Sequence, residues 1–131
     1  MKIRFSGRIS DAEPRLPARI NRGSLILGSR GRESITVDSG FTGSIAIPEE
    51  WANRLDLQYA GIQRFELANR QIVEFSTYLG PVRFGRITRL FEFIVTGEAL
   101  LGMEFFEKIG ATITFDCKSG HVLIEGELAA A

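Results

Sequence analysis

The stretch that decides the fold is SITVDSGFTGSIAIP, residues 34–48. Its first four residues have the β-branched, apolar character of a buried strand, and a second apolar run follows at 45–47. Between the two runs stand Asp38, Ser39 and Gly40, three residue types that favour turns. The stretch therefore predicts a strand, a sharp turn that begins at a carboxylate, and a second strand.

The rest of the chain has the same texture. Apolar runs of about five to eight residues, separated by Gly, Asn or Ser turns, indicate an all-β domain. Two short helices are predicted, one over 49–55 after Pro48 and one over 103–109 that ends at Gly110. Strands are predicted at 2–5, 24–27, 34–37, 44–47, 65–67, 72–75, 77–84, 86–95, 112–115 and 122–125.

These elements suggest a simple domain organisation. Residues 1–17 contain two prolines and little periodicity, so we expect an N-terminal edge strand followed by a loose arm. Residues 18–126 are expected to form one domain. Residues 127–131 are expected to be a frayed C-terminal tail.

Composition excludes several function classes. The 131 residues contain sixteen basic and sixteen acidic side chains, so the basic excess of a typical nucleic-acid binder is missing. Residues 1–32 are locally basic, which we interpret as a solvated edge. We therefore expect no nucleic-acid partner. No apolar run is long enough to cross a membrane and no signal-type segment is present, so a cytoplasmic location without membrane association is expected.

The sequence also contains few residues of the types that commonly bind metals or cofactors. Cys117 is the only cysteine and His121 the only histidine. A single cysteine allows neither an internal disulfide nor a cysteine-based metal site. His121 follows Lys-Ser-Gly, a turn sequence, so an exposed turn histidine is predicted. We expect no metal and no cofactor.

Asp38 is the residue best placed for chemistry. A carboxylate at the end of a buried strand is held rigidly by the strand behind it. Gly40 allows the backbone to turn and a substrate to approach closely, and the hydroxyl of Ser39 can bond the loop backbone. The tripeptide by itself is equally typical of a surface turn.

The surroundings of the tripeptide resemble a known family. Residues 37–48 resemble the active-site stretch of retropepsin-like (retroviral-type, clan AA) aspartic proteases, particularly small prokaryotic members. Residues 100–106, LLGMEFF, look like that family's second hallmark, two apolar residues and a glycine that lead into a short helix. The resemblance extends over about residues 18–125. It implies a single-lobed, closed acid-protease β-barrel with one or two short helices that forms a two-fold homodimer.

The resemblance also implies a mechanism that needs two carboxylates. Only one Asp-Ser-Gly occurs in the chain, so the second acid would come from another copy, as an Asp38/Asp38′ dyad. Two neighbouring carboxylates cannot both ionise cheaply, so the pair holds one proton. The ionised oxygen activates a water and the protonated one polarises the scissile carbonyl. The implied function is an aspartic endopeptidase acting on a peptide or protein substrate.

Roles for neighbouring residues follow from the same resemblance. Asp38 would be catalytic. Ser39 and Gly40 would support the catalytic loop, with the Ser39 hydroxyl bonding across the dimer. Gly40 would also bond the backbone of an extended peptide, and Thr42 would lie along the same substrate wall. The apolar pair and glycine at 100–102 would pack behind the loop.

A second hairpin falls where the family places its flap. Residues 66–72 carry Ala68, Asn69 and Arg70 at the expected tip, and these three residues are the predicted flap contacts to substrate. Relatives often have Ala-Asp-Gly there, and an arginine is costly in the left-handed geometry of a tight turn. The sequence therefore predicts a wider or differently shaped flap tip. A plain surface hairpin is the alternative interpretation.

Two other readings of the whole chain remain open. One is a catalytically weak or inactive retropepsin-like dimerisation or peptide-binding module; the other is an unrelated small β-barrel with an accidental Asp-Ser-Gly. The intact Asp38 favours catalysis, because a binding-only descendant has no need of a costly like-charge pair. In the dimer, residues 1–17 or 122–131 are predicted to hold the subunits together.

Overall fold

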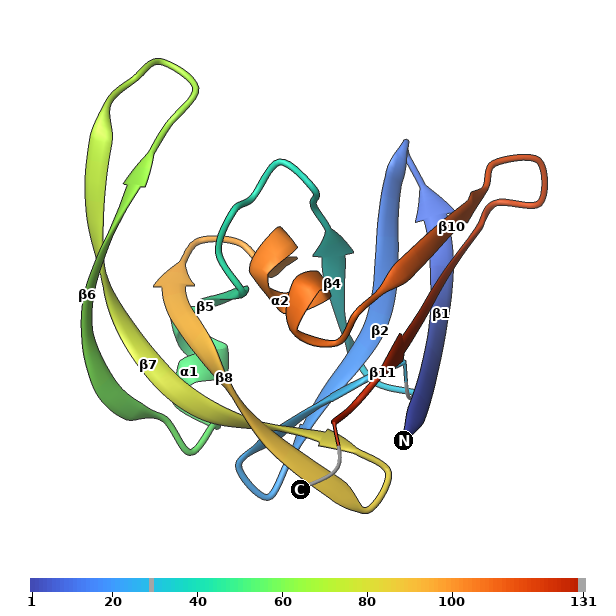
Figure 1. Cartoon of the computed structure of the whole chain (residues 1–131), viewed down its shortest axis with the longest axis horizontal. Helices are drawn as coiled ribbons and strands as arrows, with labels where there is room; N and C mark the ends of the chain where they lie inside the picture. Colours follow the sequence, from blue (N-terminus) through green and yellow to red (C-terminus); the bar gives the residue numbers. More distant parts are fainter. Residues whose placement is uncertain (29, 130–131) are drawn as a thin grey trace.

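The computed structural model describes residues 1–28 and 30–129. In these residues, eleven strands join in one sheet that curls partly into a ring, and two short helices accompany it (Figure 1). The mostly β character predicted from the sequence is confirmed. The strands are β1 (Lys2–Ser10), β2 (Glu13–Asn21), β3 (Ser24–Leu27), β4 (Glu33–Val37), β5 (Ile45–Pro48), β6 (Gln58–Glu66), β7 (Ile72–Phe84), β8 (Ile87–Thr96), β9 (Leu100–Leu101), β10 (Thr112–Asp116) and β11 (His121–Glu127). The helices are α1 (Glu49–Ala52) and α2 (Met103–Lys108).

The N-terminal segment is a β-hairpin, so the prediction of a loose arm at 1–17 is wrong. Strands β1 and β2 pair near their turn, and the expected division between residues 17 and 18 lies inside β2. The prolines do not interrupt β2, because Leu16 and Ala18, on either side of Pro17, are completely buried. Buried side chains on one face are enough to hold a strand despite missing N–H donors.

The C-terminal segment is also ordered further than predicted. Strand β11 continues to Glu127 and pairs with β1 over Lys2–Arg8. Leu128 is buried, and its backbone exchanges two hydrogen bonds with Met1. The expected fraying therefore does not begin at residue 127, while residues 130 and 131 lie outside the described part. The first and last strands pair within one chain.

Strand β9 determines how the Asp38 loop sits in the sheet. Strands β4 and β5 are consecutive in sequence, yet β9 lies between them in the sheet order. It runs parallel to β4, with Val37 opposite Leu101, and antiparallel to β5, with Ile45 opposite Leu101. All three side chains are buried. The loop after β4 thus leaves the sheet where three buried strands meet.

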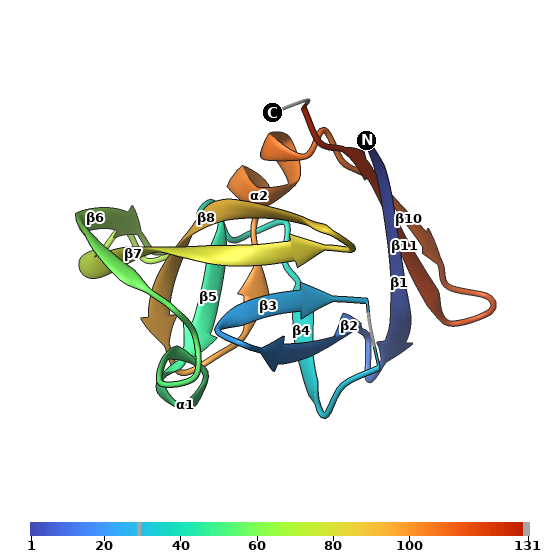
Figure 2. The same cartoon turned by 90° about the horizontal axis from the view of Figure 1, so that it is seen from below.

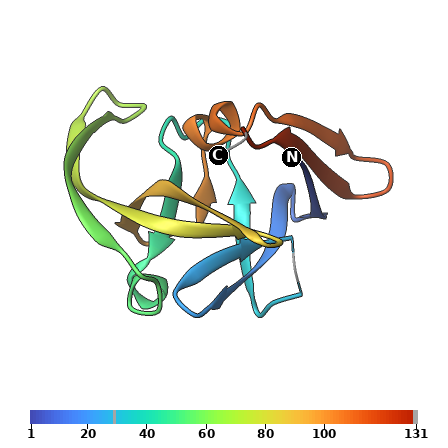
Figure 3. The same ribbon diagram turned by 60° about the horizontal axis from the view of Figure 1, so that its bottom comes forward.

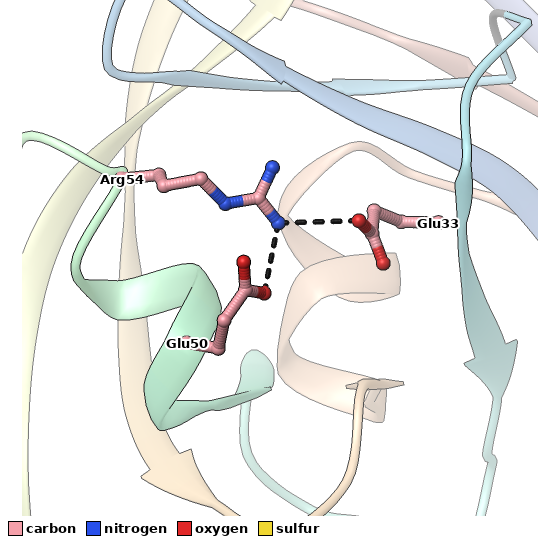
Figure 4. A network of polar contacts seen from close by, with 3 residues as sticks. All are labelled: Glu33, Glu50 and Arg54. Atoms are coloured by element: carbon pink, nitrogen blue, oxygen red, sulfur yellow. Dashed lines mark hydrogen bonds and ion pairs between the residues drawn. The ribbon is translucent and has the colours of Figure 1, made fainter.

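Helix α1 is one turn long, shorter than the predicted 49–55, and begins after Pro48 with Trp51 buried beneath it. Arg54 follows it and donates to Glu50 at 3.0 Å and to Glu33, at the start of β4, at 3.2 Å (Figure 4). Helix α2 matches its prediction closely, and Gly110 has the expected positive φ of 56°. In the described part of the chain, no helix is long and apolar enough to cross a membrane.

A long hairpin formed by β6 and β7 extends beyond the sheet. β6 begins well before the predicted 65–67, and β7 joins the predicted strands 72–75 and 77–84 into one. In the described residues, β6 is paired only with β7. Most of β6 was missed because its residues alternate between exposed and half-buried positions without a strong apolar run. The hairpin lies on one side of α2 and the β10–β11 hairpin on the other (Figure 3).

Candidate active site

Asp38 occupies the first position after β4. Its N–H donates to the carbonyl of Leu101 at 2.9 Å, which ties the loop to β9. Its carbonyl accepts from the N–H of Phe41 at 3.1 Å, and its Oδ1 accepts from the N–H of Gly40 at 2.9 Å. These bonds close a tight turn of the kind that aspartate favours. The residue is half-exposed, so a fixed carboxylate stands at the surface.

The segment behind the loop is the predicted Leu-Leu-Gly followed by α2. No side chain caps α2, and its first N–H groups instead donate to loop carbonyls. Met103 bonds the carbonyl of Phe41 at 2.8 Å and Glu104 bonds that of Gly43 at 3.2 Å. The loop therefore satisfies backbone groups that a helix start leaves open. A Cβ on Gly102 would lie 2.2 Å from the carbonyl oxygen of Gly43, so only glycine fits there.

A small cleft lies between this loop and the β6–β7 hairpin. Its volume is about 270 Å³, and Gly40, Thr42 and Ala68 are among its lining residues. The structure thus brings together three of the residues predicted to contact substrate. Asn69 and Arg70 are exposed at the hairpin tip and do not line this cleft. Ser39 is exposed beside Asp38.

A second depression adjoins the first and contains Asp38 itself. Its volume is about 550 Å³, and Glu13 and Thr36 line its far side. Both depressions have Glu98 and Leu100 in their linings. Asp38 and Gly40 therefore stand where the two depressions meet, which gives room for an extended chain to cross the carboxylate.

The cleft under the hairpin has an aromatic wall that sequence reasoning did not assign. The rings of Phe41 and Phe65 are 6.0 Å apart, and those of Phe65 and Phe75 are 5.8 Å apart. The alternation of Phe65 with polar neighbours in β6 is the signal that marks its inward face.

The shape of the hairpin tip agrees with the wider turn that its sequence predicts. The N–H of Arg70 donates to the carbonyl of Leu67 at 2.9 Å, and the N–H of Leu67 donates to the carbonyl of Gln71 at 2.8 Å. Arg70 has φ 65°, in the left-handed region. This is a three-residue hairpin loop that ends in a left-handed residue, wider than a two-residue turn. Asn69 supports it by accepting from the N–H of Gln71 at 3.0 Å.

Helix α2 carries an acidic contact near the site. Glu104 and Glu107 lie on this helix, and both residues are exposed. The carboxyl of Glu104 nevertheless meets that of Glu92 on β8. Partial burial raises the pKa of Glu104, and the charge of Glu92 and a hydrogen bond to it raise that pKa further. Gln63 on the hairpin donates to Glu92 at 3.3 Å.

In residues 1–28 and 30–129, no group of three or more His, Cys, Asp or Glu side chains is arranged to hold a metal ion. Cys117 is exposed. His121 is exposed at the β10–β11 turn, as predicted, and lies 3.1 Å from the hydroxyl of Ser119.

The chain has also been compared with known proteins. No protein-family model and no curated protein matches it. A function for the site is therefore inferred from its geometry together with the sequence motifs.

Proposed function

We propose that the chain is a homodimeric, retropepsin-like aspartic endopeptidase in which each subunit supplies one Asp38. The main support is the position of this residue. Backbone bonds to Leu101 and Phe41 hold it at the junction of two depressions, and a long hairpin projects beside it. A rigid carboxylate beside a cleft that accepts an extended chain is what hydrolysis by an activated water requires.

The proposed mechanism uses the two Asp38 carboxylates as a couple. With one proton between them, the ionised member takes a proton from a shared water. The protonated member hydrogen-bonds the scissile carbonyl, so that the water attacks it and a tetrahedral intermediate forms. A proton then passes to the leaving amine as the carbon–nitrogen bond breaks, which restores the original protonation.

The substrate would lie extended between the hairpin and the loop. Gly40 has no side chain to block a peptide backbone, and Thr42 and Ala68 form opposite walls of the small cleft. The rings of Phe41 and Phe65 provide an apolar surface for a substrate side chain. Closure of the hairpin would exclude water from the reacting centre.

The first experiment removes the acid. Asp38→Asn should lower cleavage of unfolded casein by about 10²–10⁴-fold, because the amide cannot act as the base. Asp56→Asn is the matched control, since Asp56 is an exposed aspartate outside both depressions. Pepstatin should inhibit the wild type. If wild type shows no cleavage from acidic to neutral pH while it still dimerises, the chain is a binding module instead.

The second experiment tests whether the two acids come from two subunits. Mixing wild type with a roughly ninefold excess of Asp38→Asn should lower cleavage to roughly a tenth, since most wild-type subunits would then be in one-acid dimers. Activity that stays unchanged would contradict the dimer mechanism. Glu98→Gln is the companion variant, because Glu98 lines the depression that holds Asp38. If Glu98→Gln loses all activity while the dimer stays intact, Asp38 and Glu98 of one chain would be the two catalytic acids.

A further inference from the structure

A large groove lies at the end of the molecule opposite the Asp38 loop. It has a volume of about 660 Å³ and is lined by residues from β1, β3 and the turn from β7 to β8, among others. Figures 1 and 2 show where these segments lie in the fold. None of the described residues that line it is acidic. Five of them are basic, namely Lys2, Arg4, Arg19, Arg83 and Arg86.

Three of these basic side chains have no acidic partner among the residues that the structure describes. The strand register places Ile26 opposite Arg19 and Thr88 opposite Arg83, and Arg86 lies in the β7–β8 turn. Within the described residues, none of the three arginines forms an ion pair, whereas Arg15, Arg54 and Arg64 each pair with glutamate. The groove therefore has an excess of positive charge in a chain of zero net charge.

The two basic residues on β1 are partly balanced. Lys2 stands opposite Glu127 and Arg4 opposite Glu125 in the β1–β11 pair. Cross-strand neighbours of opposite charge attract each other even without a close contact. The attraction of the groove for an anion thus depends mainly on Arg19, Arg83 and Arg86.

The groove also contains an unpaired strand edge. Met1 and Leu128 exchange both backbone hydrogen bonds, at 2.9 and 2.8 Å. Because hydrogen-bonded pairs alternate along an antiparallel ladder, the backbone groups of Lys2, Arg4 and Ser6 point away from β11. Pairing of β1 with β2 begins only at Arg8. In the described part of the chain, no other strand pairs with β1 over residues 2–6, and residues 1–5 line the groove.

We propose that this groove binds an extended acidic peptide segment of a partner protein. The segment would add as a strand to the free edge of β1 through its main chain. Its carboxylates would bind Arg19, Arg83 and Arg86 by charge-assisted hydrogen bonds. The floor of the groove is formed by apolar residues such as Ile3 and Ile26, so the alternate side chains of the segment should be apolar.

Two other occupants fit the groove less well. A strand edge presents carbonyl acceptors as well as N–H donors. A phosphate backbone is rich in acceptors and cannot pair with those carbonyl groups. The rings of Phe5 and Phe84 stack on each other and are buried, so they offer no platform for nucleic-acid bases. A second copy of β1 would bring Lys2 and Arg4 toward like charges, which opposes association.

The test uses a fluorescent, end-blocked peptide of about eight residues in which glutamate alternates with valine. Binding is measured by anisotropy on Asp38→Asn protein, so that cleavage cannot interfere and the result is independent of the proposed catalysis. The added double change Arg83→Gln with Arg86→Gln should weaken binding at least about tenfold. Lys118→Gln, in the distant β10–β11 turn, is the matched control and should leave affinity unchanged.

Two further peptides test the mode of binding. Replacing every glutamate by glutamine should abolish measurable binding, and N-methylation of alternate amides should do so when it blocks the edge that faces β1. Two such peptides exist, one methylated on each alternate set of amides, and only one of them blocks the edge that faces β1. Equal binding of the two peptides would overturn strand addition as the binding mode. The whole proposal is overturned if the acidic peptide does not bind, or if oligothymidylate of equal charge binds more tightly.

Discussion

The ring centroids of Phe41 and Phe65 lie 6.0 Å apart, so the Asp38 loop and the β6–β7 hairpin meet through an aromatic pair. The ring of Phe41 also covers Gly43, where a Cβ would lie 2.6 Å from its Cζ. This contact holds the hairpin close to the loop within one chain. It makes the position of the hairpin dependent on two side chains from distant parts of the sequence.

Removing one ring should loosen the hairpin. Aromatic pairs contribute about 0.5–1.5 kcal/mol beyond buried area, so Phe65→Ala should raise the open population by about two- to tenfold. Hydrogen exchange at the Leu67 amide, which bonds Gln71 across the tip, reports this opening. Phe115→Ala is the control, since Phe115 is half-exposed on β10. Unchanged exchange in Phe65→Ala would show that the pair does not hold the hairpin.

A side chain at Gly102 should destabilise the fold. A Cβ there would lie 2.2 Å from the carbonyl oxygen of Gly43 and 2.6 Å from that of Phe41, and backbone atoms cannot move aside cheaply. Gly102→Ala should lower the free energy of unfolding by about 1–3 kcal/mol or more in urea titrations. Gly97→Ala, with no atom within 4 Å of the new Cβ, should change it by less than about 0.5 kcal/mol. Equal effects of the two changes would contradict this account.

Arg70 should be replaceable by glycine with a gain in stability. The left-handed region costs a non-glycine residue about 1–2 kcal/mol, and Arg70 has φ 65°. Part of this gain is offset because glycine has more freedom in the unfolded chain, so Arg70→Gly should stabilise by up to about 1 kcal/mol. Asn69→Ala should act in the opposite direction, because it removes the acceptor for the Gln71 N–H. Thermal unfolding compares the two variants; destabilisation by Arg70→Gly would show that the arginine side chain itself supports the tip.

The contact of Glu104 with Glu92 should make stability depend on pH. The pKa of Glu104 is raised in the folded protein, first by partial burial and then by Glu92. Between the ordinary glutamate pKa and this raised value, the folded state binds more protons than the unfolded state. The free energy of unfolding should therefore fall as pH rises through that window.

Glu104→Gln should remove this decrease in the free energy of unfolding. At pH values above the raised pKa of Glu104, the variant should be more stable than wild type. Denaturant unfolding at a series of pH values measures it. Glu107→Gln is the control on the same helix, because Glu107 makes only a minor contribution to the raised pKa of Glu104. A wild-type slope that persists in Glu104→Gln would assign the pH dependence to other groups.

Local sequence signals predicted the features that depend on neighbouring residues. The strand before Asp38, the hairpin tip at Ala68–Arg70 and the helix stop at Gly110 all follow from short-range chemistry, and the structure has each of them. The prolines of β2 misled the prediction, because the burial of Leu16 and Ala18 that holds this strand is a property of the assembled sheet.

The cleft and the basic groove could not be predicted for the same reason. Phe41 and Phe65 are 24 positions apart in the sequence, and no local pattern says that their rings meet. Arg19 on β2 and Arg83 on β7 both stand opposite Ile26 of β3, and this arrangement depends on the parallel pairing of β3 with β7. The basic character of residues 1–32 was visible in the sequence, but its interpretation as a solvated edge did not foresee a groove completed by the β7–β8 turn.

The place of β9 between β4 and β5 has a consequence for the order of assembly. Residues 34–48 contain both bonds that close the turn at Asp38, but the bond that ties this turn to β9 runs from its N–H to the distant carbonyl of Leu101. Closing so long a loop is slow relative to forming local hairpins. The acid therefore acquires its fixed orientation late, after the hairpin and β8 are in place. In an incompletely folded chain, Asp38 lacks its bond to β9 and its loop is not held against the sheet. The site is therefore formed only once the core is complete.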